Sequence, residues 1–526
     1  MSDSHHEHYE NLSDKQKNRT IWSVIMASSL GTLIEWYDFY IFGSLAVVLA
    51  TKFFPADNPT AAFLSTLATF AAGFVVRPFG ALFFGRLGDL IGRKYTFLVT
   101  LLIMGFSTFL IGCIPSYETI GFMAPVLVLI LRLLQGLALG GEYGGAATYV
   151  AEYAQPHRRG YWTSWIQTTA TAGLFISLIV ILITKTSLSA EEFDTWGWRV
   201  PFWISILMVV VSYFIRKNMK ESPLFAKAKS EGKTSTNPLK ESFGNRFNFK
   251  FVLLALFGAA MGQGVIWYTG QFYAMSFMQK VMNIDTTQVD SLMALALFLG
   301  TPFFVFFGWL SDKVGRKAVM MTGMLVAILA YRPIYSAMFN SIDIAKKEVA
   351  AGGITESRTV KVHDKVATDS LITFHKEIAY TDGTLLKKDS IVHWSAAGPV
   401  MKDGKAEEPK VSKSIKISDD TKWYLVLLVF IQVIFVTMVY GPIAAFLVEM
   451  FPVRIRYTSM SLPYHIGNGV FGGLLPAVAT YLVTTGKDAG HAGWYLEGLW
   501  YPIGVAAVCL VIGLVYIKNK NQNIHD

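Results

Sequence analysis

The sequence has few charged residues and very few cysteines. Asp, Glu, Lys and Arg make up 16% of its 526 residues, whereas soluble proteins carry about 25%. The chain therefore lacks the polar side chains needed to cover several water-exposed domains, which excludes a soluble globular enzyme and a disordered protein. Cys113 and Cys509 are its two cysteines, and each lies inside an apolar run. This excludes a disulfide framework and a cysteine metal site.

Motifs of enzyme chemistry are also missing. The sequence contains no phosphate-binding loop, no zinc-ligand spacing and no nucleophile elbow. Residues 467–472 have the letters of a dinucleotide fingerprint, but they lie inside an apolar segment and not between a strand and a helix. We therefore expect no enzyme activity, no metal site and no cofactor.

Long apolar runs are abundant. Hydrophobic residues make up 53% of the chain, and a helix needs about 20 apolar residues to cross a bilayer. The sequence therefore predicts an all-α polytopic membrane protein with twelve transmembrane helices. The twelve apolar segments lie at about residues 21–50, 61–84, 95–114, 121–148, 162–184, 199–215, 251–279, 287–310, 318–339, 424–447, 459–483 and 497–517.

The positions of the basic residues predict the orientation. Connector 216–250 carries nine Lys or Arg residues and three Glu residues, and basic loops stay on the cytoplasmic side. This linker divides two pseudo-symmetric six-helix halves, 21–215 and 251–517, and puts both tails, 1–20 and 518–526, in the cytoplasm. We expect a multi-pass protein of the plasma (inner) membrane. The net charge of +9 then comes largely from cytoplasmic loops whose basic residues fix the orientation, and we expect no nucleic-acid partner.

Residues 341–421 interrupt the second half with a polar, charged stretch. Strict alternation of the spans puts this insert on the outer face. Alternation of apolar and polar residues in 359–363, 371–380 and 384–393 predicts strands, and Asp382-Gly383 favours a tight hairpin turn between two of them. The sequence therefore predicts a small extracytoplasmic insert that contains β-structure.

A decapeptide with the pattern G-x-L-x-D-x-x-G-R-K occurs twice, after the second and eighth apolar segments. In each copy an Asp ends one helix while Arg and Lys begin the next, so the loop can form a charge-assisted contact with a neighbouring helix end. We predict a gating role on the cytoplasmic side; the alternative is that the basic residues only enforce topology. The gating residues are Gly85, Asp89, Gly92, Arg93 and Lys94 in the first copy, and Gly308, Asp312, Gly315, Arg316 and Lys317 in the second.

Four further motifs, together with the two decapeptides, resemble those of a known family. They are G-T-L-I-E-W-Y-D-F at 31–39, R-P-F-G at 77–80, R-L-L-Q-G running to G-G-E at 132–142, and Y-G-P through E-M-F-P at 440–452. With the two decapeptides, the chain resembles the major facilitator superfamily, and within it the metabolite:proton symporter family of shikimate, α-ketoglutarate, citrate and proline or betaine carriers. The resemblance implies two helical halves that rock about a central site. It does not extend to residues 341–421, and His465 stands where the family pattern has an asparagine.

Charged side chains inside apolar segments are costly and are therefore functional candidates. Glu35 and Asp38 are three residues apart and share one helical face. Two carboxylates in a low dielectric cannot both ionise cheaply, so one of them should take up a proton. We assign proton coupling to Glu35, Asp38, Arg132 and Glu142. The alternative is a permanent carboxylate–arginine pair that joins the first and fourth helices.

Arg77 and Arg332 are candidate anchors for a substrate carboxylate, because a guanidinium binds a carboxylate through two parallel hydrogen bonds. For both residues a structural contact is an equal alternative. Polar and aromatic residues of the first, fourth, seventh and eleventh segments are candidate walls of the site, although such residues often belong to the core. They are Trp36, Tyr37, Gln135, Gln263, Trp267, Tyr268, Gln271, His465 and Asn468.

The sequence thus predicts a secondary transporter that imports a small polar metabolite, an organic acid or a zwitterion, by proton symport and alternating access. We expect its partners to be the small-molecule substrate and the lipid bilayer, and we expect it to function as a monomer. Two alternatives remain: a passive facilitator of the same fold, and a membrane receptor or sensor that uses the insert.

Overall fold

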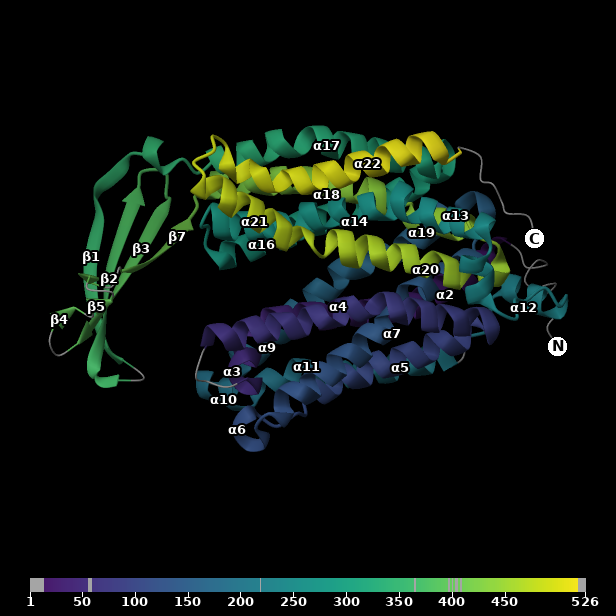
Figure 1. The fold of residues 1–526 in the computed structure, drawn as a ribbon, viewed down its shortest axis with the longest axis horizontal. Coiled ribbons are helices and arrows are strands. Elements are labelled where there is room, and N and C mark those ends of the chain that lie inside the picture. The colour runs from purple at the N-terminus through teal and green to yellow at the C-terminus, as the bar shows by residue number, and fades with distance from the viewer. Residues whose placement is uncertain are drawn as a thin grey trace.

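The computed structural model describes residues 14–54, 59–217, 219–363, 366–395, 398–399, 401–402, 405–406 and 409–518. The predicted tails 1–20 and 518–526 lie largely outside these residues. Long helices run along the longest axis of the molecule, and a β-sheet stands at one end (Figure 1). We call this the insert end. Helix α12 (Pro223–Ser230) lies at the opposite end, the α12 end.

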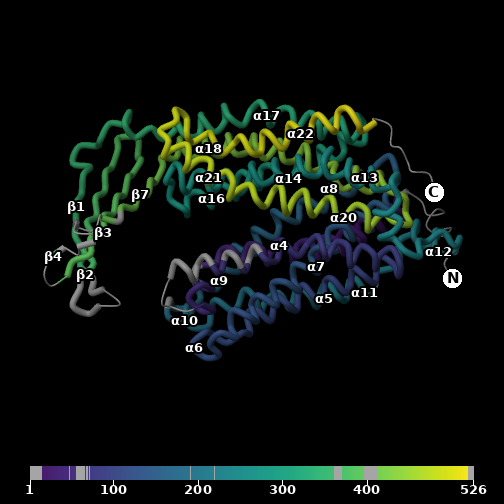
Figure 2. The backbone as a smooth tube through the Cα atoms, viewed as in Figure 1, coloured from purple at the N-terminus to yellow at the C-terminus, as the bar shows by residue number. Residues whose placement is uncertain are grey.

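The helices before α12 form the N-terminal group. Its members are α2 (Asp14–Ser44), α3 (Ala46–Phe53), α4 (Pro59–Leu90), α5 (Arg93–Ile111), α6 (Tyr117–Ile120), α7 (Met123–Tyr153), α8 (Arg159–Ser164), α9 (Thr169–Ser187), α10 (Ala190–Thr195) and α11 (Val200–Lys217). Helices α4, α5, α7, α9 and α11 of this group lie below the helices that follow α12 in Figure 1, and α8 reaches those upper helices (Figure 2).

The helices after α12 form the C-terminal group. They are α13 (Arg246–Ala255), α14 (Met261–Tyr268), α15 (Ala274–Ser276), α16 (Thr286–Val314), α17 (Arg316–Asn340), α18 (Asp419–Tyr440), α19 (Ile443–Glu449), α20 (Arg456–Ile466), α21 (Leu475–Asp488) and α22 (Trp500–Tyr516). Short 3-10 and π segments continue several of them, such as η7 (Phe277–Val281) and η10 (Gly467–Gly472). The two groups touch where α20 packs on α4 and α16 packs on α8.

Ten helices of the described residues are long and apolar enough to cross a membrane. They coincide with the third to twelfth predicted segments. The first two predicted segments, 21–50 and 61–84, are helical as α2 with α3 and as α4, but they are not among these ten. The structure is therefore mostly helical as predicted, and the count of twelve membrane spans stays a prediction.

Glycines bring α4 and α7 into backbone contact. A Cβ added at Gly136 would lie 2.1 Å from the carbonyl oxygen of Gly73, and one added at Gly80 would lie 1.9 Å from that of Leu137. Such close packing is typical of membrane helices. Their association depends on van der Waals packing, and small residues allow the backbones to approach closely. This packing fixes the position of the charged residues that α4 and α7 carry.

The insert forms the predicted β-structure. Its main sheet is antiparallel in the order β1 (Val349–His363), β2 (Val366–Tyr380), β3 (Leu385–Ser395) and β4 (Gly398–Pro399), and β7 (Lys410–Lys416) also pairs with β3. A second, two-stranded sheet joins β5 (Met401–Lys402) to β6 (Lys405–Ala406). The hairpin turn between β2 and β3 falls at Asp382-Gly383, and Gly383 adopts a positive φ of 86°. The sequence did not predict β7.

The sheet is fixed to the helices through β7. The backbone N–H of Ile415 donates to the carbonyl of Asn283 at 2.8 Å, and the N–H of Asp285 donates to the carbonyl of Ile415 at 2.9 Å. The side-chain amide of Gln288 on α16 exchanges two hydrogen bonds with the backbone of Ile417, at 2.8 and 3.1 Å. Figure 2 shows β7 on the side of the sheet that faces the helices.

Candidate functional site

A small central cavity lies where the two groups meet. Its volume of about 40 Å³ is enough for a water molecule, so a metabolite requires the walls to move apart. The N-terminal group contributes residues of α2 and α4, and the C-terminal group contributes residues of α14, α18, α20 and η10. The lining residues are Glu35, Trp36, Phe39, Phe74, Arg77, Trp267, Tyr268, Tyr440, Tyr464, His465, Asn468 and Gly469.

An ion pair crosses one wall of this cavity. Arg77 Nη1 donates to Glu35 Oε1 at 3.1 Å, and the guanidinium lies 4.3 Å from the ring centre of Phe74. Among the described residues, Nε of Arg77 and Nε2 of the buried His465 have no hydrogen-bond partner. The cavity thus holds a carboxylate, a guanidinium and an imidazole whose hydrogen-bonding capacity is not fully used.

A second carboxylate–arginine pair lies beside the cavity. Arg132 Nη1 donates to Asp38 Oδ2 at 2.7 Å, and both side chains are buried. Arg132 also contacts the amide oxygen of Gln135, whose nitrogen donates to Thr108 Oγ1 at 2.6 Å. Glu35 and Asp38 share one face of α2 as expected, but each contacts its own arginine. Asp38 Oδ1 has no partner among the described residues.

Glu142 belongs to a separate cluster. Its carboxylate contacts Arg216 Nη2 at 2.6 Å and accepts from Thr100 Oγ1 at 2.9 Å. Arg216, which the sequence assigned to the basic linker, is 1% exposed and lies 3.4 Å from the ring centre of Phe97. Glu142 lines neither the central cavity nor the larger cavity that is described below.

The aromatic candidates divide between the cavity and the core. Trp36 and Trp267 face each other across the group boundary, with ring centres 5.1 Å apart. Tyr37 points elsewhere, because its hydroxyl donates to the carbonyl of Pro201 at 2.6 Å. Gln263 and Asn468 exchange two amide hydrogen bonds of 3.1 and 3.2 Å, which joins α14 to η10 at the cavity wall.

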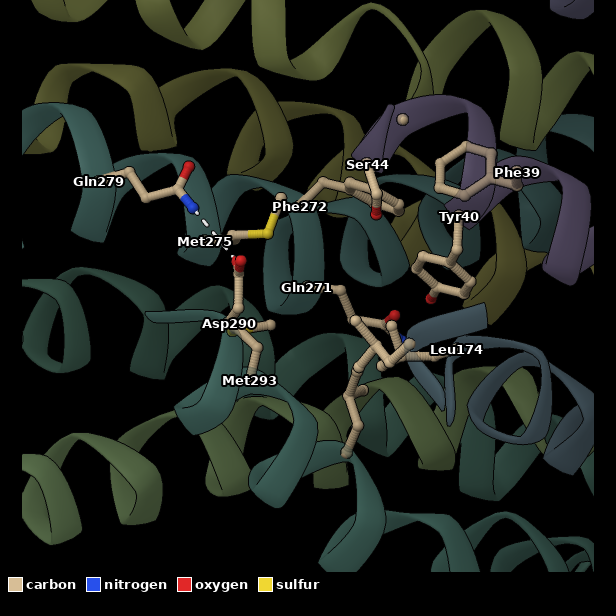
Figure 3. A pocket seen from close by; sticks show the side chains of 13 residues that line it. Phe39, Tyr40, Ser44, Leu174, Gln271, Phe272, Met275, Gln279, Asp290 and Met293 are labelled. Carbon is tan, nitrogen blue, oxygen red and sulfur yellow. Dashed lines mark hydrogen bonds between the residues drawn. The ribbon is translucent and has the colours of Figure 1, made fainter. Parts of the chain in front are cut away.

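A larger cavity of about 350 Å³, the vestibule, extends toward the insert end. Figure 3 shows Phe39, Tyr40, Gln271 and Phe272 around it, with Gln279 and Asp290 at its side. Gln279 Nε2 lies 3.5 Å from Asp290 Oδ1. Gln271 therefore lines the vestibule and not the central cavity. Arg332 lines neither, since it contacts the carbonyl of Leu496 at 3.4 Å and lies over the ring of Trp500.

At the α12 end, each decapeptide binds the first turn of a helix in the other group. Asp89 accepts the N–H groups of Tyr457 and Thr458 at 3.3 and 2.8 Å, at the start of α20. We call this contact the first latch. Asp312 accepts the N–H groups of Gly160 and Tyr161 at 2.9 and 2.7 Å, at the start of α8; this is the second latch. Free N–H groups and the helix dipole both favour an anion there.

Buried ion pairs support the first latch. Arg93 contacts Asp89 at 3.1 Å and Glu152 at 3.3 Å, and Arg456 contacts Glu152 at 3.1 Å. The linker joins the same network, because Glu221 accepts the N–H of Arg93 at 3.1 Å. Burial raises the pKa of Glu221.

The second latch has an equivalent network. Arg316 contacts Asp312 at 2.6 Å and Glu449 at 3.1 Å. Glu152 and Glu449 were not among the predicted site residues. A signal for them exists, because Glu152 precedes Arg159 by the same seven positions that separate Glu449 from Arg456. Both decapeptides thus contact an equivalent element of the opposite group.

The fold and these contacts define a class of protein. Apolar helices surround a charged central cavity, and two equivalent loops join the two groups of helices at one end. This arrangement is that of a membrane transporter.

Comparisons with known proteins also indicate a membrane transporter. The profile of the family "Sugar (and other) transporter" matches residues 23–245. The alpha-ketoglutarate permease of Escherichia coli strain K12 is 29% identical over 515 residues, which cover 98% of each chain. The inner membrane metabolite transport protein YhjE of the same strain is 35% identical over 343 residues, which cover 63% of this chain and 75% of that protein. The solved structure of the proton:xylose symporter XylE bound to 6-bromo-6-deoxy-D-glucose has the same fold, with a TM-score of 0.62 at 16% identity over 96% of this chain and 98% of that chain.

The chain belongs to the major facilitator superfamily, in its metabolite:proton symporter family. It is a multi-pass membrane transporter of small metabolites and not an enzyme.

Proposed function

We propose that the protein is a secondary active transporter that couples the uptake of a small polar metabolite to the movement of protons. The Glu35–Arg77 pair at the central cavity carries this proposal. A substrate carboxylate that binds Arg77 displaces Glu35 from the guanidinium. The displaced carboxylate then takes up a proton, because an unpaired charge in a low dielectric is costly. Substrate and proton therefore favour each other's binding, and this coupling is reciprocal.

Asp38 and Arg132 provide the second coupling pair. Arg132 lies on α7 and Asp38 on α2, so a shift of either helix changes their 2.7 Å contact. Asp38 keeps one oxygen without a partner in the described structure, which leaves a position for a proton or a water molecule. Proton release follows when Arg132 returns to Asp38, since the ion pair favours the charged carboxylate.

The cavity walls favour an organic acid or a zwitterion. Arg77 offers a planar fork for a carboxylate, and Asn468 and His465 offer further polar contacts. Trp36, Trp267 and Tyr464 supply apolar and aromatic surface for the rest of the molecule. The name of the alpha-ketoglutarate permease, a relative that aligns over nearly the whole chain, supports a carboxylate-bearing substrate.

The proposed transport cycle uses alternating access. Both latches are formed at the α12 end, while the vestibule extends toward the insert end. Substrate enters through the vestibule, reaches the central cavity, and leaves when the latches part and the two halves rock. In this scheme the protein has twelve spans in two pseudo-symmetric halves.

Orientation and partners follow from the same scheme. The α12 end and both termini face the cytoplasm of a plasma (inner) membrane, and the insert faces outward, as the basic linker indicates. The protein works as a monomer in the bilayer, with the proton as its coupling ion and without metal, cofactor or nucleic acid.

The test is uptake by purified protein in proteoliposomes. A thermal-shift screen with shikimate, dicarboxylates, citrate, proline and betaine first selects a substrate. Radiolabelled substrate should then accumulate above its outside concentration when the inside is made alkaline, and accumulation should stop when a protonophore removes the gradient. Uptake that only equilibrates, with or without the gradient, would contradict symport and identify a passive facilitator.

A further inference from the structure

Strand β1 forms the edge of the sheet that lies farthest from the helices. The strand order begins with β1 and reaches β7, and β7 carries the backbone contacts to the helical body. Figures 1 and 2 both show β1 on the outer side. Within the described part of the chain, no strand pairs with its outer edge.

The central part of this edge, residues 354–360, is long enough and regular enough to pair with another strand. Natural proteins protect sheet edges with bulges, prolines, very short strands or charged side chains. The register irregularities of β1 lie outside this part, between Val349 and Ile354 and between Val362 and His363, and its two charges, Glu356 and Arg358, are of opposite sign. The register of β1 with β2 runs without a shift from Ile354 to Val360, and this segment contains no proline. All seven side chains are exposed; Ile354 is 53% and Val360 is 56% exposed.

The segment I-T-E-S-R-T-V at 354–360 is complementary to itself. In an antiparallel pair of two copies centred on Ser357, Ile354 lies opposite Val360 of the second copy. Thr355 then lies opposite Thr359, and Glu356 opposite Arg358. Residues directly opposite each other point to the same face of a sheet, and aliphatic, Thr–Thr and opposite-charge pairs all stabilise it. A slip by one residue to either side removes the Glu–Arg match.

We propose that β1 is a homotypic docking strand through which two copies of the protein join by antiparallel β1–β1 pairing centred on Ser357. The contact has two-fold symmetry, as expected of a self-complementary surface. Because the β1 edge points away from the helices, the two copies meet insert end to insert end, and they lie in facing bilayers or separate detergent micelles. One strand pair is a small interface, so firm attachment requires several copies in each membrane.

Cross-linking tests the register. In a Cys113→Ser background, Ser357→Cys should form a covalent dimer with a short bismaleimide, because the two introduced thiols lie directly opposite each other. Ser412→Cys is the matched control: it is also an exposed serine on an edge strand, but on β7. Equal dimer yields from the two variants, or no dimer from Ser357→Cys, would overturn the proposal.

A charge exchange tests the pairing itself in proteoliposomes, with clustering followed by light scattering. Arg358→Glu places like charges opposite each other twice, and we expect at least a tenfold loss of clustering. Glu356→Arg should act in the same way, and the double exchange should restore clustering.

The double exchange also removes the pair of Glu356 with Lys376 inside the sheet, so restoration cannot come from a repaired fold. Substrate uptake should be unchanged in all variants and reports intact folding. Failure of the double exchange to restore clustering, with normal uptake, would contradict homotypic pairing and favour a different partner strand.

Discussion

The latches at the α12 end and the central cavity both contain carboxylate–arginine pairs, but the carboxylates differ in how many of their oxygens have a hydrogen-bond partner. Both oxygens of Asp89 and of Asp312 accept a helix N–H, and each carboxylate also has an arginine. In and beside the cavity, by contrast, Asp38 Oδ1 and His465 Nε2 have no partner among the described residues. Nε of Arg93 and Nε of Arg316 also have no partner in the described part of the chain, so the contrast lies in the carboxylates. A carboxylate with both oxygens hydrogen-bonded holds a structure in place, whereas an oxygen or imidazole nitrogen without a partner can still accept a ligand or a proton. The comparison separates groups that close the protein from groups that bind.

Removal of a latch carboxylate should have the largest effect. Asp89→Ala leaves two helix N–H groups without their acceptor and removes the buried pair with Arg93, which keeps its contact with Glu152; loss of a buried pair costs about 3–5 kcal/mol. The α12 end should then open. Opening is measured by alkylation of Ser461→Cys, a buried position between α7 and α20, in a Cys113→Ser background.

Asp312→Ala sharpens this result. The same contacts are made there, but the pair with Arg316 is slightly exposed, so we expect a smaller rise in alkylation. If both variants are alkylated no faster than the Ser461→Cys protein with intact latches, the latches do not hold this end closed.

A change in the cavity should affect substrate binding and leave the latches unchanged. Arg77→Lys keeps the charge but loses the planar fork, and we expect at least a tenfold rise in KM with little change in thermal stability. Arg454→Lys is the matched control, because Arg454 is about half exposed and contacts only Glu241 among the ion pairs of the structure's described residues. Equal KM values for the two variants would remove Arg77 from the binding site.

A substitution of Glu142 tests whether this buried carboxylate has a structural role or takes part in proton coupling. Its carboxylate is enclosed by Arg216 and Thr100, so Glu142→Gln should lower the Tm by several degrees through the loss of a buried pair. We expect coupling to the proton gradient to survive in the folded protein. Glu118→Gln, at the exposed helix α6, should change neither property. Loss of gradient-driven accumulation at unchanged Tm would place Glu142 in the coupling machinery instead.

Replacement of residues 349–416 by a short Gly/Ser linker should have the smallest effect on transport. The insert contacts the helices through a few residues near Asn283 and Gln288, and the cavities are lined without it. We expect the uptake rate to change by less than about twofold, within the range of surface effects. Full uptake by this variant would argue against the receptor alternative, whereas a complete loss of uptake in a folded variant would show that the insert takes part in transport.

Local patterns predicted the helices and strands β1, β2 and β3 of the insert, because hydrophobic periodicity and turn residues are local signals. Partners were harder to predict. The sequence identified Asp89 but not the N–H groups of Tyr457 and Thr458, which lie more than 360 positions away. It placed Glu35 and Asp38 on one face, yet could not show that α4 and α7 bring a separate arginine to each. It missed β7 because Lys413 interrupts the apolar alternation of Val411 and Ile415.

Proton movement in the Glu35→Gln protein tests the central claim most directly. Proteoliposomes with a pH-sensitive dye inside should acidify when substrate is added to the wild-type protein. The Glu35→Gln protein should still exchange labelled for unlabelled substrate, because Arg77 is retained, but it should show neither acidification nor accumulation. Acidification equal to that of the wild type would contradict proton coupling through the Glu35–Arg77 pair.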